Sequence, residues 1–167
     1  MYISQSTYEK LNDFLQKCFQ MNSYCDNLAY NMSALHMINV EPVFHEKFAH
    51  VFPGFADIVS EMMVKLDAKP IRKALLANTD DYDNFQLIFT DLKDNIDNYR
   101  EDIISVIESA DINGDVEVKI TMEKFLLNFM NYLNQVNIWY KKSKEYSHIE
   151  DFNQDFTSFT FICGDLN

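Results

Sequence analysis

The chain has 167 residues, 47% of them hydrophobic and 14% aromatic, with only three glycines and three prolines. This composition excludes a disordered or loop-dominated chain, and a single domain of this length buries a full core without disulfides or structural metal. The 26 acidic and 14 basic residues give a net charge of −12, which repels phosphate backbones and attracts cations, so direct DNA binding is not expected.

Cysteine usage and hydropathy indicate the compartment. The three cysteines, Cys18, Cys25 and Cys163, are odd in number and form no Cys-x-x-Cys pair, which favours a reducing environment. No run of about 18 apolar residues is present, and the N-terminus lacks the basic-then-apolar layout of a signal peptide. We therefore expect a soluble, cytoplasmic protein with no membrane segment.

Two long helices are predicted in the first part of the chain. Apolar residues recur at spacings of three and four over residues 6–37, which is the stripe of an amphipathic helix. Ser6 and Glu9 have the spacing of a capping box at its start. A second helix is predicted over residues 43–67, and Pro53, followed by a glycine, must kink or break it.

The remaining chain predicts further helices and an aromatic tail. A short helix is expected over residues 71–77 and a long one over residues 82–110. A turn around Gly114 leads into a last long helix that ends near Tyr146. This turn superficially resembles an EF-hand loop, but its glycine falls at position four instead of six, so we interpret it as a helix–helix turn. Residues 147–167 cover a seam or form an extended arm.

Together these elements predict an all-α protein. Residues 1–146 form one domain, a four-helix bundle with a short helix in the crossover between the second and third long helices, and residues 147–167 are a tail, not a separate domain.

Candidate metal ligands lie on and before the predicted second helix. Asp57 and Glu61 are four residues apart, so both carboxylates project from one helical face. Two hard oxygen donors with an imidazole from elsewhere suit a divalent transition metal such as iron; the alternative is a solvated acidic face. His36 and His45 are the candidate imidazoles, and each is otherwise a polar cap or a packed side chain. His50 is five residues from His45, a poor spacing for shared ligation on an α-helix.

Several segments resemble the Dps-type mini-ferritins, a branch of the ferritin-like family. LHMINVEP is similar to the family's His-Trp and Gly-Pro pattern, FHEKF to its Leu-His-Glu-x-Phe, and DIVSEMMVKLDAKP to its Asp-x-x-x-Glu-Arg segment with a closing proline. VNIWYKK is similar to the family's last-helix segment that ends in a tryptophan. The similarity spans residues 8–146.

The resemblance implies a ferritin-like bundle assembled as a hollow homododecamer. It implies iron oxidation, preferably by hydrogen peroxide, with storage of Fe(III) and protection against oxidative damage. His36 and His45 of one subunit, with Asp57 and Glu61 of its neighbour, would hold the iron. Such a mixed nitrogen and oxygen shell suits Fe(II) and leaves positions open for the oxidant. The alternative is a ferritin-like structural or binding module that has lost the site and takes up no iron.

Overall fold

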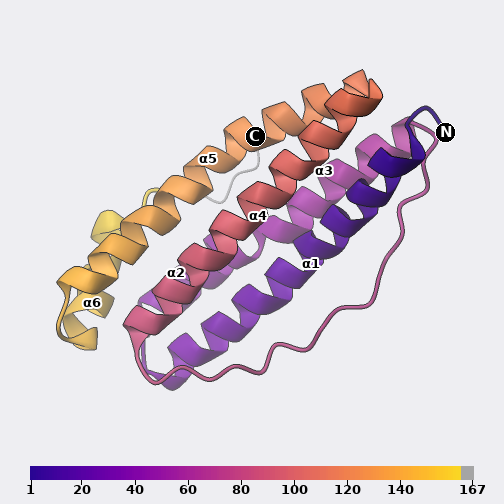
Figure 1. Ribbon diagram of the computed structural model, residues 1–167. Helices are drawn as coiled ribbons and strands as arrows, with labels where there is room; N and C mark the ends of the chain where they lie inside the picture. The colour runs from indigo at the N-terminus through magenta and orange to yellow at the C-terminus, as the bar shows by residue number, and fades with distance from the viewer. Residues whose placement is uncertain (163–167) are drawn as a thin grey trace.

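The computed structural model describes residues 1–162, and every regular element among them is helical. α1 (Gln5–Ala34) runs antiparallel to α3 (Val51–Lys65), which runs parallel to α4 (Phe85–Asn113), and α5 (Val116–Glu145) returns antiparallel to α4 (Figure 1). A long crossover joins α3 to α4. The predicted all-α bundle of four long helical stretches is therefore confirmed, with one crossover connection.

The second helical stretch is assembled from three consecutive pieces. α2 (Val40–Phe44) leads into a π-helical segment, His45–Ala49, and α3 follows after His50. The irregularity expected at Pro53 therefore lies a few residues earlier in the chain.

Ser4 connects two helix ends at one end of the bundle through hydrogen bonds. Its hydroxyl accepts a hydrogen bond from the Thr7 amide (3.2 Å) and donates one to Asp115 Oδ2 (2.7 Å). Ser4 therefore caps α1, and the prediction of a cap at Ser6 is wrong because the chain is already helical from Gln5. The predicted turn around Gly114 is present, and Gly114 ends α4 with φ +73°, a backbone conformation that favours glycine.

The predicted apolar stripes form the core. Phe55 of α3 lies near its centre, with its ring 4.9 Å from that of Phe125 and 5.5 Å from that of Tyr132, both on α5. Tyr99 of α4 is fully buried and its ring centroid is 5.2 Å from that of Phe14 of α1. Edge-to-face and tilted ring pairs of this kind add to the free energy of apolar burial.

The tail covers a seam of the bundle. α6 (Ile149–Asp155) and a 3₁₀ turn, Phe156–Phe159, fold back along α5, as Figure 1 shows. Phe152 is fully buried with its ring 5.2 Å from that of Phe89, and the Trp139 ring stacks on Phe156 at 5.2 Å. Of the two expected positions, residues 147–162 therefore adopt the one against the bundle, and residues 163–167 of the predicted tail lie outside the described residues.

The crossover segment, residues 66–84, contains no regular helix. The prediction of a short helix over residues 71–77 is therefore wrong. In place of internal helical hydrogen bonds, the segment lies along α1 (Figure 1), and side chains of α1 satisfy its backbone groups. A seven-residue helix has little stability of its own, so such external partners decide the conformation.

The partners of the crossover are amides on one side of α1, which we call the polar row: Asn12, Gln16, Gln20, Asn27 and Asn31. Gln20 binds Leu76 twice, donating from Nε2 to its carbonyl (3.0 Å) and accepting from its amide (2.8 Å). Asn31 donates to the Asp80 carbonyl (2.9 Å) and accepts from the Tyr82 amide (3.0 Å). The side-chain amides of the polar row thus donate to and accept from the backbone of the extended crossover, as the backbone of a neighbouring β-strand would.

Hydrogen bonds from two tyrosine hydroxyls stabilise the end of the crossover. The hydroxyls of Tyr24 on α1 and of Tyr82 both donate to Oδ2 of Asp91 on α4, each at 2.6 Å. Burial and these bonds to a carboxylate raise the pKa of both phenols well above the usual range. Both hydroxyls therefore stay protonated and hold the crossover against α1 and α4.

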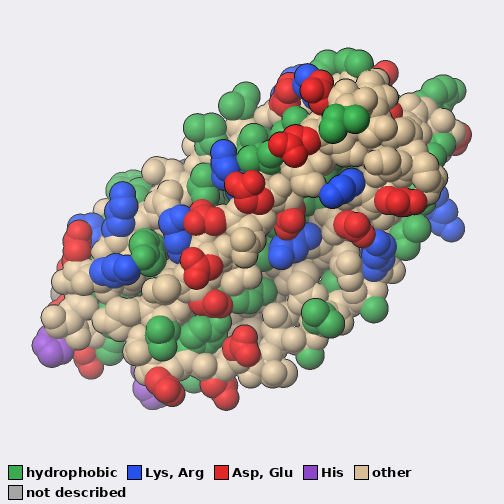
Figure 2. All heavy atoms as spheres, in the orientation of Figure 1, with side chains coloured by type: hydrophobic (Ala, Val, Ile, Leu, Met, Phe, Trp, Pro, Cys, Tyr) green, Lys and Arg blue, Asp and Glu red, His purple; other side chains and the backbone are tan. Residues whose placement is uncertain are grey.

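Acidic and basic side chains are interspersed over the face of the molecule drawn in Figure 2. Among residues 1–162, no helix combines the length and the apolar character needed to cross a membrane.

Candidate metal centre

The π-helical segment His45–Ala49 is a widened turn in the second helical stretch. The amide of His50 donates to the carbonyl of His45 (3.3 Å), so the hydrogen bond spans five residues instead of four. Pro53 explains where this occurs, because its ring would meet the carbonyl of Ala49 in an uninterrupted α-helix and it has no amide to donate. Widened turns of this kind are frequent at functional sites.

The widened turn brings two histidines together. On an α-helix, residues five apart point about 140° away from each other. Here the rings of His45 and His50 lie one above the other, with centroids 4.3 Å apart and planes at 63°. The prediction that their spacing is poor for shared ligation is therefore wrong, because it assumed α-helical geometry throughout.

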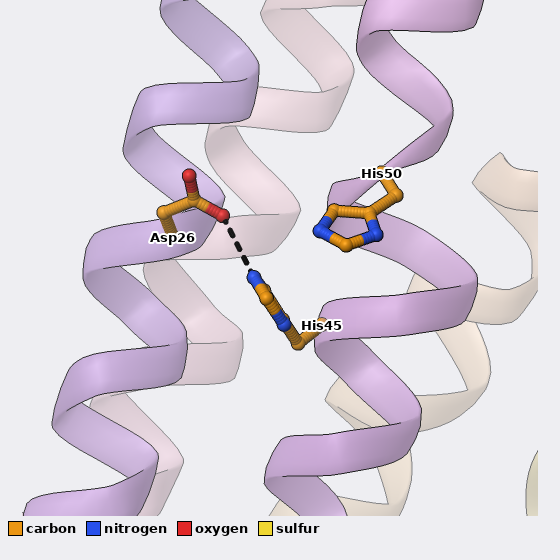
Figure 3. Close-up of side chains that lie close together, drawn as sticks. All are labelled: Asp26, His45 and His50. Atoms are coloured by element: carbon orange, nitrogen blue, oxygen red, sulfur yellow. Dashed lines mark ion pairs between the residues drawn. The ribbon is translucent and has the colours of Figure 1, made fainter.

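Asp26 of α1 completes a group of three donors. Its Oδ1 lies 3.3 Å from His45 Nε2, and one ligand atom from each of Asp26, His45 and His50 lies within 4.8 Å of the other two. Figure 3 shows the carboxylate on one helix and both imidazoles on the neighbouring helical stretch, turned toward the space between them. The three residues come from two packed elements, and α1 contacts both the π-helical segment and α3.

The Asp26 carboxylate is unusually poor in hydrogen bonds for its burial. Its Oδ1 is buried but accepts no hydrogen bond within the described chain, although it pairs with His45. Its Oδ2 accepts only a long bond (3.4 Å) from Asn22, one turn earlier on α1, whose own Oδ1 is also buried without a partner among residues 1–162. A buried oxygen without a hydrogen-bond donor lowers the stability of a protein and is rare. A cation bound at the Asp26 carboxylate would supply the missing partner.

The group is accessible and has the donor chemistry of a transition-metal site. The side chains of Asp26 and His45 are 28% and 35% exposed, and His50 is exposed. Two imidazole nitrogens and one carboxylate oxygen are the donor set of mononuclear Fe(II) and catalytic Zn(II) sites, which keep positions open for further ligands.

The four ligands predicted from sequence are divided by the structure. His45 belongs to the three-donor group, whereas His36 lies in the turn between α1 and α2, exposed and with φ +58°. Asp57 and Glu61 are exposed on α3, four residues apart as expected. Within one copy of the described chain, none of these three joins a group of three donors. Their predicted convergence across two subunits stays a prediction.

Sequence reasoning missed Asp26 and His50. Asp26 follows the buried Cys25 on α1 and stands out only because an acidic side chain sits beside the apolar stripe. For His50 a signal does exist: Pro53 removes the α-helical hydrogen bond to the Ala49 carbonyl, so α-helical spacing is not a safe assumption for the turn before it.

No model of a known protein family matches the chain, and none of the curated proteins with which it was compared matches it. The functional interpretation therefore rests on the geometry of this site, the order of the helices and the short motifs quoted above.

Proposed function

We propose that this protein is a ferritin-like iron protein of the mini-ferritin type, which binds Fe(II) at Asp26, His45 and His50 and oxidises it. The convergence of these three donors carries the proposal, because it brings two imidazoles to a buried carboxylate oxygen that pairs with His45 and accepts no hydrogen bond among residues 1–162. A four-helix bundle with a single long crossover, the arrangement of ferritin-like folds, supports it. The motifs that resemble mini-ferritins support it further.

The reaction that fits this site is electron transfer from iron to hydrogen peroxide. Each peroxide accepts two electrons, one from each of two Fe(II) ions, and with two protons yields two water molecules and two Fe(III) ions. The imidazoles suit Fe(II), and carboxylate oxygens favour the harder Fe(III) that forms. The net charge of −12 per chain raises the local concentration of Fe(II) around the molecule.

Three donors in one chain leave room for donors from a second copy. Asp57 and Glu61 offer two carboxylates from one exposed face of α3. We propose that a neighbouring subunit contributes them in a homododecamer, opposite Asp26, His45 and His50. In this arrangement Asp26 and His50 complete the half-site around His45. The sequence alone predicted His36 for that role.

Peroxide-driven oxidation of Fe(II), followed by stopped-flow absorbance, tests the site. His50→Ala and Asp26→Asn should each slow the reaction about tenfold or more, since each removes a donor and leaves the helices in place. His148→Ala is the matched control, because His148 is exposed and lies before α6. Wild-type rates in both site variants, or a wild-type protein that binds no Fe(II), would refute the proposal.

A second pair of variants tests the contribution of the neighbouring subunit. Glu61→Ala should slow oxidation sharply while the oligomer, measured by light scattering, stays intact. His36→Ala should leave the rate unchanged if Asp26 and His50 complete the half-site. An intact shell that takes up no iron would instead support a structural or binding role for the bundle.

A further inference from the structure

Pro53 follows the widened turn that shapes the donor group, although proline offers no metal-binding atom. It lies in the first turn of α3, four residues after Ala49. In a continuous α-helix the carbonyl of Ala49 would point at the Pro53 ring and find no amide. The widened segment ends at Ala49 itself. The extra residue of the π-helical turn therefore lies directly before the carbonyl that Pro53 cannot bind.

The core side of the same segment is compatible with this widening. Phe44 and Phe48 stack at 5.3 Å, and the Phe48 ring meets Phe52 edge-on at 5.5 Å. All three rings are fully buried. The aromatic side chains thus stay in the core across the widened turn, and the imidazoles of His45 and His50 are left on the side that faces α1.

We propose that Pro53 is a positioning residue of the metal site, which holds the helix in the π-helical register that pairs His50 with His45. The proposal rests on the metal site proposed above. If the turn relaxed to α-helical geometry, the two histidines would point about 140° apart and the carboxylate of Asp26 would face one imidazole instead of two.

The test compares Pro53→Ala with Pro42→Ala. Alanine is the strongest helix former, so Pro53→Ala favours the α-helical register. Pro42 is the matched control, because it lies in the first turn of α2 and the carbonyl four residues before it belongs to Ile38, outside the helix. Two readouts are used: the dissociation constant of Co(II), with its visible absorption as a report of coordination, and the cross-relaxation between the imidazole protons of His45 and His50 in metal-free protein.

Pro53→Ala should weaken Co(II) binding about tenfold or more and lose the cross-peak between the two rings, whereas Pro42→Ala keeps both. Deleting Glu46 in the Pro53→Ala background places His45 and His50 four residues apart, so an α-helix then brings them together and binding should return. A loss of stability alone would not be rescued in this way.

The outcomes separate the two proposals. If wild-type protein shows the cross-peak but binds no Co(II) or Fe(II), the proposed function fails. If wild-type protein binds Co(II) and Pro53→Ala binds it equally well, with the cross-peak retained, the role of Pro53 is refuted and the metal site stands. Weakened binding with the cross-peak retained also refutes the positioning role.

Discussion

Replacing Asn31 by alanine should detach the last part of the crossover from α1. The Asn31 side chain is only 7% exposed and holds the crossover from both sides of its amide group. Nδ2 donates to the carbonyl of Asp80 (2.9 Å), and Oδ1 accepts from the amide of Tyr82 (3.0 Å). Alanine removes both bonds to the crossover, together with the bond that Nδ2 donates to the Asn27 carbonyl within α1 (2.9 Å), and keeps the helical propensity of α1.

The expected loss follows from the number of bonds. Each hydrogen bond contributes a net free energy of about 1 kcal/mol, and a donor left without a partner adds to the loss, so Asn31→Ala should lower the free energy of unfolding by about 2–3 kcal/mol. For a chain of this length that corresponds to a fall in Tm of about 4–12 °C. Asn98→Ala is the control, because Asn98 is exposed on α4, and its effect should stay within about 0.5 kcal/mol.

Urea denaturation measures the free energy, and hydrogen exchange locates the effect. The amides of Ile71, Leu76 and Tyr82, which donate to side chains of the polar row, should be protected in wild type. In Asn31→Ala the Tyr82 amide should exchange fastest, because its acceptor is gone. If Asn31→Ala matched Asn98→Ala in stability and the exchange of Tyr82 were unchanged, the crossover would not be held by the polar row.

Three further predictions concern the bundle itself. Gly114→Ala should cost about 1 kcal/mol in urea denaturation, because φ +73° strains any side chain while the space around the new Cβ is open; an unchanged midpoint would contradict this. Phe152→Ala should cost about 3–5 kcal/mol, as expected for a fully buried ring, and a loss below about 1 kcal/mol would mean that the tail does not belong to the cooperative core. Burial raises the pKa of the Cys18 thiol to about 12, so at pH 8 the protonated thiol should resist alkylation in folded protein and react only on unfolding; rapid labelling of native Cys18 would show that the core opens.

The long helices could be predicted because their periodicity encodes a buried face directly. The apolar stripe predicted for the third long helix, Phe85 to Ile107, is buried as far as Ile103, and Ile107 is partly buried. The stripe predicted for the last helix is buried from Met122 to Trp139. Burial of one face every 3.6 residues is the property that stabilises such helices, so pattern and structure have the same cause.

The crossover could not be predicted by the same reasoning. Residues 71–77 are good helix formers, but a short helix must compete with any external partner for its backbone groups. The polar row supplies those partners from α1, more than fifty residues away in sequence for each pair that Asn12, Gln16 and Gln20 make. Amides at one side of α1 look like ordinary surface positions until the segment that they bind is known.

The candidate site could be predicted only in part, for a related reason. The motif identifies His45, and Pro53 predicts a break, but neither feature alone identifies His50. Across the π-helical segment a spacing of five residues, not four, brings two side chains together, and this spacing selects His50. Asp26 requires the packing of α1 against the π-helical segment, which no local pattern contains.

The surroundings of α1 also limit how a second copy can complete the proposed iron site. One side of α1 is buried in the bundle, and the polar row is covered by the crossover. The seam that holds Asp26 and His45 remains partly open, whereas Asp57 and Glu61 are exposed on α3, where Glu61 lines a pocket with Glu117 and Thr121 of α5. In the proposed assembly, the exposed face of α3 of a neighbouring subunit would lie against the α1–α3 seam, so a bulky substitution on that face should block both assembly and iron oxidation. The same substitution on the crossover, at the exposed Leu76, should block neither.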